Sequence, residues 1–586
     1  MFLFYRQKKE ELYPIGKEIP LKDNDTYRFL DSITVHALKT GKTRMMVLAY
    51  LFLIAFIIIG IRLFDQTILK QSIKTHNKSI LSTSRPVSRA DIVDRKGRIL
   101  ATSLPIVDLY VDARYMPDAH KMAEDLISIF PDLNKENLIK KLLSKNSFIY
   151  LRRNLTPQEQ YAVNRLGYPQ LNFEASERRV YPHSHLFSHL IGFTNIDNVG
   201  IAGIEKQYEN ILTQNQDALT LSVDIQIQDI VHTILSEAVE KFTADGAVCL
   251  VLDAKTSEVL AMVSLPDFDL NKTPIDPNTI SLNKATVGMY ELGSVMKPFT
   301  VAFGLESGLI TPQSEIEAFN PYKLAKGRTI TDFQAEDRIL TVPEILIYSS
   351  NIGTAKIAQM LGPQVQRDFL NRFHFLSILD INLPEKGHPI VQKKWDDVET
   401  ATIGYGYGLA VSPLHLASAF NALVNNGLYQ YPTFIKDGNK NAVYEQLLSE
   451  ETSQQIRQML RGVVKIGSAK TANVTGFNVI GKTGTAQLQD PKTGKYIEGK
   501  VRTSFIGTFP MDKPKYIVYV MMENPAKRKE DWYFNTAGWN ASPTAGKIIE
   551  AIAPMLGIEQ KEEIPSASYM QSAYDYALEK KKKKGR

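Results

Sequence analysis

An unbroken apolar stretch near the N-terminus is the first feature of the hydrophobic pattern. Met45–Ile61 holds 17 residues without a charge, and Leu63–Phe64 extends the stretch past Arg62. At about 1.5 Å per residue it approaches the roughly 30 Å hydrocarbon core of a bilayer, so it predicts one transmembrane helix over residues 45–64. The stretch is long, starts late and precedes no small-x-small cleavage site, which disfavours a cleaved signal peptide. A buried core helix is the other alternative.

Beyond this stretch the periodicity of apolar residues changes along the chain. Residues 65–215 mix short strand-like runs with helical patterns such as 121–130 and 134–143. From Leu219 onward, alternating strands and amphipathic helices continue to about residue 560, which predicts an α/β (α+β) sandwich. The pattern therefore predicts five segments: 1–44, 45–64, 65–215, 216–560 and a Lys-rich tail over 561–586.

Basic residues gather on the N-terminal side of the apolar stretch. Lys39, Lys42 and Arg44 precede it, whereas Arg62 alone follows it closely. The positive-inside rule then places residues 1–44 in the cytoplasm and the rest of the chain outside it.

Composition agrees with a large exported protein. The 586 residues are 44% hydrophobic, enough for several domains with a sizeable core. The net charge of +6 is spread along the chain, with one run at Lys580–Lys584 that is typical of a disordered, solvated end. That run leaves open a weak contact with anionic lipid or wall polymer, but no nucleic-acid partner is expected outside the membrane. The single cysteine, Cys249, lies in an apolar run and is predicted to be a small core residue.

Three short motifs follow one another within the predicted sandwich. They are Ser294-Val-Met-Lys297, Ser349-Ser-Asn351 and Lys482-Thr-Gly484. Each pattern is short enough to occur by chance in a chain of this length, so local context has to choose among the copies. Further copies begin at Ser281 (first and second patterns), Ser144 (second), Lys39 and Lys492 (third).

Local context favours the copy that starts at Ser294. A small-residue turn precedes it and an apolar segment follows, which predicts that Ser294 starts a helix. Three residues is nearly one helical turn, so Lys297 lies beside Ser294 and can take the hydroxyl proton. Pro298 is tolerated near such a helix start. Ser281 stands in a polar stretch with no apolar helix behind it.

The second and third motifs are interpreted from their local sequence and from their order after the first. Lys482–Gly484 lies between short β-prone runs, which fits a strand edge whose N–H groups face a site. The copies at Lys39 and Lys492 are interpreted as loops. Ser349–Asn351 alone would be an ordinary helix followed by a polar turn. Between the other two motifs it completes a set of residues suited to acyl transfer through a serine ester.

This motif set resembles the penicillin-binding protein and serine β-lactamase superfamily. Gly246–Ser264 is similar to the first two strands of the transpeptidase domain in class B penicillin-binding proteins, and Pro266–Asn271 continues the likeness. Arg89–Ala101, Arg179–Pro182 and Gly200–Glu205 are similar to the non-catalytic pedestal of that class.

The likeness covers roughly residues 45–555 and extends to the subclass. Thr286–Ser294 and Ala537–Pro543 resemble the division-specific, septal enzymes of Gram-negative bacteria, especially α-proteobacteria. Two positions depart from the family: Lys284 stands where Arg is usual, and His415 where Gln is usual.

The resemblance implies a fold and a location. Residues 216–560 would form a serine transpeptidase or β-lactamase-like sandwich, and residues 65–215 a mixed α/β pedestal of the penicillin-binding protein dimerisation type. The helix over 45–64 would cross the inner membrane once and leave the catalytic domain in the periplasm. The pedestal is too short to hold the glycosyltransferase domain of a bifunctional enzyme.

The resemblance also assigns roles to the motif residues. Ser294 would be the nucleophile, and Lys297 the general base, its pKa lowered by burial and by a second cation, Lys482. Ser349 would relay a proton to the departing amine, and Asn351 would hold Lys297 and the donor peptide.

Substrate binding would fall to the third motif. Backbone N–H groups of Ser294 and Thr485 would form the oxyanion hole. Lys482, Thr483, Gly484 and Thr485 would bind the donor and its terminal carboxylate.

Substrates and partners are implied in the same way. The donor would be a peptidoglycan stem ending in D-Ala-D-Ala, the acceptor an amine of a neighbouring stem, and β-lactams would be inhibitors. Protein partners would be a membrane glycosyltransferase and small division proteins. The alternatives are an elongation-specific transpeptidase, a D,D-carboxypeptidase or β-lactamase, and an inactive scaffold of the division complex.

Two further patterns carry less weight. His183, His185 and His189 match no zinc spacing, so no metal is expected. The sequence has no Walker or dinucleotide-binding motif, so no cofactor is expected either. Thr402–Gly406 imitates a potassium-channel filter, but one membrane span cannot build a pore. Its glycines are expected to serve tight backbone packing beside the site.

Overall fold

The computed structural model describes residues 32–64, 88–272, 281–490, 493–527 and 534–584, and the chain divides into two compact units, Met1–Arg85 and Pro86–Arg586.

The first unit contains helix α1 (Ser32–Phe64). The apolar stretch lies on α1, and its described side chains from Met45 to Ile59 are largely exposed. No helix in the described part of the chain combines the length and apolarity needed to cross a membrane. The transmembrane helix over 45–64 therefore stays a prediction. Lys39–Gly41 lies within α1, so its interpretation as a loop is wrong. Lys492 and most of the cytoplasmic segment lie outside the described residues.

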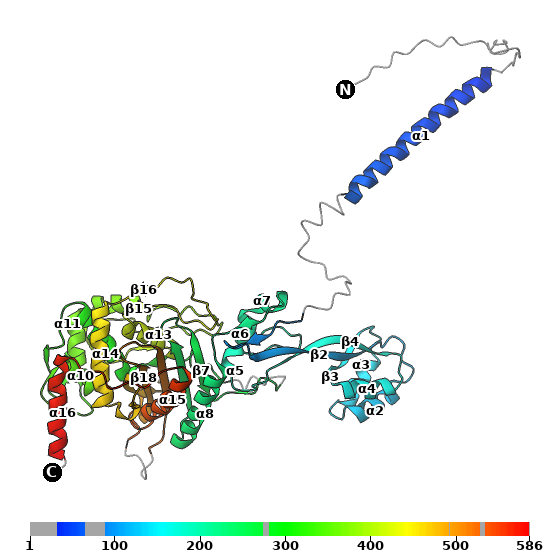
Figure 1. The fold of residues 1–586 in the computed structure, drawn as a ribbon. Helices are drawn as coiled ribbons and strands as arrows, with labels where there is room; N and C mark the ends of the chain where they lie inside the picture. The colour runs from blue at the N-terminus through cyan, green and yellow to red at the C-terminus, as the bar shows by residue number, and fades with distance from the viewer. Residues whose placement is uncertain (1–31, 65–87, 273–280, 491–492, 528–533, 585–586) are drawn as a thin grey trace. The chain divides into compact units, whose positions relative to one another are not determined.

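A five-stranded sheet opens the second unit (Figure 1). Strand β2 (Ile99–Val111) pairs antiparallel with β1 (Ile92–Val93), β3 (Ile149–Leu155) and β4 (Leu171–Val180). Strand β1 also pairs in parallel with β5 (Leu219–Thr220), which leads into the part of the chain that carries the three motifs. This part, residues 216–584, is called the catalytic part after the role expected of the motifs.

The far end of β2 belongs to a lobe with its own core. Helices α2 (Ala119–Ile129), α3 (Lys135–Leu142) and α4 (Pro157–Arg165) pack there around a separate hydrophobic cluster. We call this part the distal lobe (residues 107–173). Helices α2 and α3 confirm the two helical patterns expected in this region. Each begins at a side chain that caps its first turn, Asp118 for α2 and Asn134 for α3.

The near end of β2 shares the main hydrophobic core. Ala90, Leu100 and Ile204 belong to the same buried cluster as the catalytic part. Beside them, Glu205 accepts from Arg89 Nε and from Arg179 Nε, both at 2.7 Å, and all three side chains are buried. This ion triad joins the three pedestal-like segments of the sequence.

The central sheet of the catalytic part has five antiparallel strands. Their order is β17 (Ile480–Gln489), β18 (Tyr496–Phe509), β19 (Tyr516–Glu523), β6 (Gly246–Asp253) and β7 (Val259–Leu265). Strand β17 is an edge strand, as expected for the third motif. Strand β6 is buried along nearly its whole length because helices cover both faces of the sheet. The lone cysteine is a buried core residue of β6, as expected.

Helices form two layers around this sheet. Helices α8 (Ile225–Phe242) and α15 (Ala541–Met555) pack together against β6, β7 and β19. Helices α13 (Pro413–Val424) and α14 (Glu450–Lys465) pack together, with α13 against β6 and β19 and α14 against β17. This arrangement confirms the α/β sandwich. A group of further helices packs on α14. Helices α9 (Lys297–Glu306) and α10 (Val342–Ile347) contact it directly, α11 (Asn351–Arg372) packs on α9, and α12 (Asp397–Gly404) packs on α11.

The end of the chain is folded, contrary to the expectation of a disordered tail. Helix α16 (Gln571–Lys584), red in Figure 1, follows the short turn η5 (Ser568–Met570). Met570 and Ala573 are fully buried in the main core, which fixes this helix to the catalytic part. A run of lysines alone gave no sign of these contacts.

Shorter elements complete the fold. They are α5 (Ser188–Ile191), α6 (Gly203–Gln207), α7 (Glu209–Gln214), β8 (Tyr290–Glu291), η2 (Gly293–Met296), β9 (Glu315–Glu317), β10 (Tyr322–Lys323), η3 (Ala325–Gly327), β11 (Thr329–Ile330), β12 (Ile339–Thr341), β13 (Ile390–Val391), β14 (Leu409–Val411), β15 (Leu428–Tyr429), β16 (Glu445–Gln446) and η4 (Lys470–Ala472).

Candidate active site

Ser294 lies in η2, directly before α9. In a 3₁₀ turn the side chains at i and i+3 eclipse one another, so Ser294 and Lys297 share one face. Pro298 occupies the first turn of α9, where its missing N–H costs nothing. Ser294 is half-buried and Lys297 is fully buried. The predicted helix start is confirmed, with a tighter first turn than expected.

Glycines hold this segment close to its neighbours. Gly293 donates its N–H to the Gly406 carbonyl at 2.9 Å. A Cβ on Gly406 would lie 1.9 Å from the Gly293 oxygen, so no larger residue fits there. A Cβ on Gly293 would lie 2.9 Å from the Thr485 oxygen, and one on Gly484 would lie 2.6 Å from Ser504 Oγ. The expected tight packing at Gly406 is confirmed, and it seats the serine turn on strand β17.

Lys297 Nζ has three hydrogen-bond acceptors. It lies 2.5 Å from the Ser349 carbonyl oxygen, 3.1 Å from Ser349 Oγ and 2.7 Å from Asn351 Oδ1. The second motif is thus brought against the lysine of the first.

Lys482 donates to the same hydroxyl. Its Nζ donates to Ser349 Oγ at 3.0 Å and to the Thr483 carbonyl at 3.2 Å. Ser349 Oγ therefore bridges two fully buried lysines. The structure brings Lys297, Ser349, Asn351 and Lys482 into one hydrogen-bonded group, with Ser294 one turn before Lys297.

Burial lowers the pKa of both lysines. For Lys297, desolvation lowers the pKa to about 7, against an opposing effect of the Asp332 carboxylate. For Lys482, burial and then the charge of Lys297 hold the pKa well below its usual range. The second-cation effect expected on Lys297 therefore falls on Lys482. Both lysines therefore give up a proton near neutral pH far more easily than free lysines do.

The remaining third-motif residues lie along the edge strand. Thr483 Oγ1 is 2.6 Å from Ser468 Oγ, and Thr485 Oγ1 accepts from the Ala537 N–H at 3.3 Å. Ala537 begins the second segment that carried the septal resemblance. Thr483 and Thr485 are therefore both held by hydrogen bonds along the edge of β17, next to η2.

Ser349 occupies an unusual backbone conformation. Its φ is +58°, in the left-handed region that non-glycine residues rarely adopt. It sits between the end of α10 and the start of α11 at Asn351. Such strain is retained where the surroundings fix it, and it is common at functional sites.

Asp332 was not found from the sequence. Its carboxylate accepts from the Asn351 N–H at 2.5 Å, the Ile352 N–H at 3.1 Å and Ser350 Oγ at 2.6 Å. Asn351 Nδ2 donates to the neighbouring Thr331 carbonyl at 2.8 Å. Asp332 therefore caps α11 and fixes Asn351, although no sequence pattern linked it to the motif.

A cavity of about 440 Å³ lies among segments that adjoin the motifs, although none of the five catalytic candidates lines it. Its lining includes Glu291, Tyr407 and Gln487, which belong to the segments around Ser294, Gly406 and Thr485. It is large enough for a peptide side chain and its neighbours.

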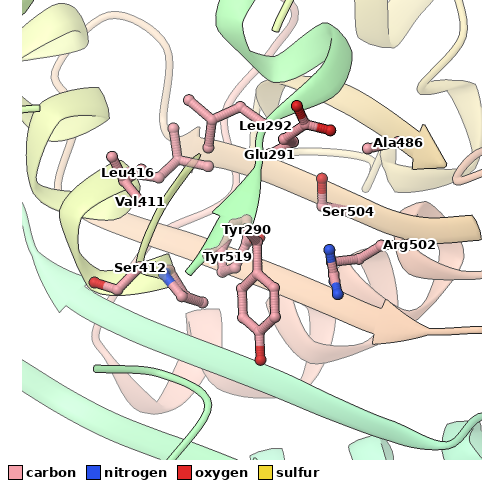
Figure 2. Close-up of a pocket in the computed structure, with 11 residues that line it drawn as sticks. Tyr290, Glu291, Leu292, Val411, Ser412, Leu416, Ala486, Arg502, Ser504 and Tyr519 are labelled. Atoms are coloured by element: carbon pink, nitrogen blue, oxygen red, sulfur yellow. The ribbon is translucent and has the colours of Figure 1, made fainter. Parts of the chain in front are cut away.

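A second cavity is too small for a substrate. It encloses about 10 Å³ behind β8, room for one water at most. Figure 2 shows the Arg502 guanidinium beside the Tyr290 side chain there, and Arg502 lies 3.9 Å from the ring centroid. This cavity is part of the packing beneath the site.

The two departures from the family have stable local partners. Lys284 Nζ pairs with Glu523 Oε2 at 2.5 Å. His415 is buried, with Nδ1 2.7 Å from Ser412 Oγ and Nε2 3.0 Å from the Ser377 carbonyl. The alternative serine, Ser281, bonds to the Pro266 carbonyl and to His189, whereas its motif lysine, Lys284, pairs with Glu523.

One group of described residues could hold a metal ion. Ligand atoms of His185, His232 and Asp267 lie within 4.8 Å of one another. His232 Nε2 already bonds Asp267 Oδ2 at 2.8 Å, so the pair also satisfies itself. His183 and His189 do not belong to the group. The expected absence of a metal stays a prediction.

Comparison with known proteins follows the same division of the chain. Residues 247–550 match the family model of the penicillin binding protein transpeptidase domain, and residues 84–234 that of the penicillin-binding protein dimerisation domain. Fold and motifs together define a serine transpeptidase with a non-catalytic domain in front of it. The chain belongs to the penicillin-binding proteins, and its two domains are those of the class B type. The resemblance inferred from the motifs is confirmed.

Relatives support the same assignment. The chain is 36% identical to a probable peptidoglycan D,D-transpeptidase FtsI of Caulobacter vibrioides, covering 81% of this chain and 83% of the relative. It is 28% identical to the peptidoglycan D,D-transpeptidase FtsI of Escherichia coli, covering 80% and 84%.

Solved structures share the fold. Penicillin binding protein 3 of Mycobacterium tuberculosis, in complex with aztreonam, aligns with a TM-score of 0.63 and 24% identity, covering 83% of this chain and all of that one. The transpeptidase domain of penicillin-binding protein 3 from Burkholderia pseudomallei aligns with a TM-score of 0.52 and 31% identity, covering 58% and 98%.

Proposed function

We propose that this protein is a peptidoglycan D,D-transpeptidase that cross-links stem peptides at the division septum through a serine acyl-enzyme. The observation that carries this function is Lys297, a buried amine with a pKa of about 7, one turn from Ser294. Relatives named FtsI, a peptidoglycan D,D-transpeptidase, support the same reaction and the septal role.

Acylation begins with proton transfer from Ser294 to Lys297. Ser294 Oγ attacks the carbonyl carbon of the penultimate D-Ala, and neutral Lys297 takes the hydroxyl proton. The C–N bond then breaks, and Ser349 relays a proton to the departing D-Ala amine. Ser349 Oγ suits this task because it contacts both Lys297 and Lys482. Asn351 holds Lys297 and the donor peptide in place.

The third motif stabilises charge on the donor. N–H groups of Ser294 and Thr485 form the oxyanion hole, each worth about 3 kcal/mol in the transition state. Lys482, Thr483, Gly484 and Thr485 bind the donor and its terminal carboxylate. An arriving carboxylate favours the charged form of Lys482, which offsets the effect of burial.

An amine of a neighbouring stem then attacks the ester and frees Ser294. The cavity beside Tyr407 and Gln487 gives room for one of the two stems. β-Lactams mimic the D-Ala-D-Ala end and acylate the same serine, and their ester persists.

Domain limits and location belong to the same proposal. Residues 65–215 form the pedestal and residues 216–560 the transpeptidase domain. The two matched family models, over 84–234 and 247–550, support a division into these two domains. The uncharged stretch on α1 crosses the inner membrane once, with residues 1–44 in the cytoplasm and the catalytic domain in the periplasm. Its partners are a membrane glycosyltransferase and small division proteins, which contact the pedestal and the membrane helix.

Covalent labelling with a fluorescent penicillin tests the acyl-enzyme. The full-length protein, Ser294→Ala and the matched control Ser281→Ala are labelled and compared. We expect a stable label that only Ser294→Ala loses. A label that persists in Ser294→Ala, or no label on the wild type, would reject the mechanism and leave a scaffold role.

Product analysis separates the remaining alternatives. With a D-Ala-D-Ala peptide and an added amine acceptor, a transpeptidase forms the new amide, whereas a carboxypeptidase releases the shortened peptide alone. Depletion in cells distinguishes the septal role, which gives filaments, from an elongation role, which gives round cells.

A further inference from the structure

The C-terminal helix α16 contacts a buried carboxylate near the site. The Glu336 side chain is only 6% exposed. Its Oε2 accepts from the Tyr576 hydroxyl at 2.9 Å, and its Oε1 pairs with Lys580. A buried carboxylate is costly without partners, and here each oxygen is bonded to α16.

Arg338 extends this contact toward α10. Its guanidinium lies 3.8 Å from the Tyr576 ring centroid and pairs with Glu344 Oε1 at 2.7 Å. Glu344 accepts from the Thr341 N–H at 2.9 Å and so caps the start of α10. Helix α10 is thereby linked to the C-terminal helix at its first turn.

Tyr348 links the other end of α10 to the same helix. The Tyr348 and Tyr576 rings meet edge to face at 6.0 Å, and Lys580 Nζ lies 5.4 Å from the Tyr348 ring centroid. The residue after Tyr348 is Ser349, which is held in its left-handed conformation.

The segment 331–338 carries a second connection. Glu336 binds α16, and four residues earlier Asp332 binds the N–H groups of Asn351 and Ile352. One short segment therefore joins the C-terminal helix to Asn351, and Tyr348 joins it to Ser349. Both targets contact Lys297 Nζ.

The helix is itself firmly seated. Met570 and Ala573 are buried in the main core, and Lys465 Nζ lies 5.1 Å from the Tyr574 ring centroid. Contacts that fix one end of a helix let its other residues act as fixed supports.

We propose that Tyr576 and Lys580 are positioning residues for the reaction. They hold Tyr348 and the segment 331–338, and thereby set Ser349 and Asn351 around Lys297. This inference rests on the proposed function, because it assigns the two residues a role in acylation of Ser294.

The test measures acylation by a fluorescent penicillin in the full-length protein. Tyr576→Phe removes one hydroxyl and keeps the ring, and Lys580→Met removes the charge. Lys580→Arg keeps the charge, and Lys581→Met is the matched control on the exposed side of α16. We expect Tyr576→Phe combined with Lys580→Met to slow acylation by roughly 10- to 100-fold, the scale of a misplaced catalytic group. Lys580→Arg and Lys581→Met should behave as the wild type.

The pH profile separates positioning from simple loss of folded protein. Lys297 faces Lys482 and Asp332, and the Asp332 carboxylate raises its pKa. If segment 331–338 moves away in the variants, the fall of the acylation rate at acid pH should begin at a lower pH. All molecules should still carry the label at completion. Partial unfolding would instead reduce the final label and leave the profile in place.

The outcomes separate the two levels of inference. If the wild type labels at Ser294 and the single and double variants acylate at its rate and with its profile, the positioning role is wrong and the proposed function stands. If the variants only lose final label, the helix is structural and the positioning role is also wrong. If the wild type does not label at Ser294, the proposed function fails and the positioning role falls with it.

Discussion

Lys297 combines two opposing influences at the level of single residues. Three acceptors around Nζ favour the ammonium, whereas complete burial favours the neutral amine. Burial is the larger effect, and the pKa falls to about 7. A base with a pKa near the working pH is present in its active form and still accepts a proton readily.

The first prediction is a pH dependence of acylation. A base acts when unprotonated, so the rate should fall about tenfold per pH unit below pH 7 and level off above it. Lys297→Arg should lose roughly 10²- to 10⁴-fold, because a guanidinium does not deprotonate. Time courses with a fluorescent penicillin from pH 5 to 9 measure both effects.

Lys284→Arg is the matched control for this prediction. It restores the residue that is usual in the family, keeps the charge beside Glu523 and should leave the profile unchanged. A flat wild-type profile through neutral pH would contradict the role of Lys297.

The second prediction concerns Asp332, which sequence reasoning missed. Asp332→Asn removes the charge that raises the pKa of Lys297, so the acid limb should shift to lower pH. It also weakens the bonds to the Asn351 and Ile352 N–H groups, which should cost about 1–3 kcal/mol of stability. Acylation profiles and urea unfolding of the same variant test both parts. A shift to higher pH would contradict the assigned electrostatic effect.

Residues close in sequence were predictable, and residues joined only by the fold were not. The spacing of Ser294 and Lys297 predicted that they lie on one face, because residues three apart are nearly one helical turn apart. Asp332 reaches Asn351 across 19 residues without any periodic pattern. The sequence also predicted that Lys482 lowers the pKa of Lys297. In the structure burial lowers it instead, and the depth of burial is not known before the fold is.

At the level of elements, periodicity was the reliable signal. Helices α2 and α3 lie where apolar spacing placed them, and the edge strand β17 lies where β-prone runs flank the third motif. Strand β6 lies where the family resemblance placed a strand. Helix α16 was not predicted, because residues distant in sequence hold it: Tyr576 donates to Glu336, and Met570, just before the helix, lies beside Gly462. Tertiary contacts there outweigh the composition of the lysine run.

The third prediction is an acid-dependent stability centred on helix α13. His415 bonds Ser412, the N-cap of α13, and burial lowers the His415 pKa to about 4. The unfolded chain binds this proton near pH 6.5, so stability should be lost as the pH falls from 6.5 to 4. The loss should be about 3 kcal/mol.

His415→Gln, the residue usual in the family, should remove this component. Urea unfolding of the wild type and His415→Gln at pH 8 and pH 5 measures this component. The wild type should lose more free energy of unfolding between the two pH values than His415→Gln does. An equal loss of stability in both proteins on acidification would contradict the assignment.

At the level of the whole molecule, the pedestal is divided between two cores. Its base shares the main hydrophobic core and the ion triad of Arg89, Arg179 and Glu205. The distal lobe has a core of its own around residues such as Leu126. Cooperative unfolding follows shared cores, so the base should unfold with the catalytic part and the lobe separately.

The fourth prediction contrasts one variant in each core. Glu205→Ala leaves two buried guanidinium groups without their shared carboxylate, which should cost roughly 3–5 kcal/mol. Because the triad lies in the shared core, penicillin labelling and far-UV circular dichroism should fail together at a lower urea concentration. Leu126→Ala should cost a similar roughly 2–5 kcal/mol, but within the lobe alone. Part of the circular dichroism signal would then be lost early, while the urea midpoint for Ser294 labelling stays at the wild-type value. If Leu126→Ala moved that midpoint as far as Glu205→Ala does, the two cores would be one cooperative unit and the pedestal could not move independently of the transpeptidase domain.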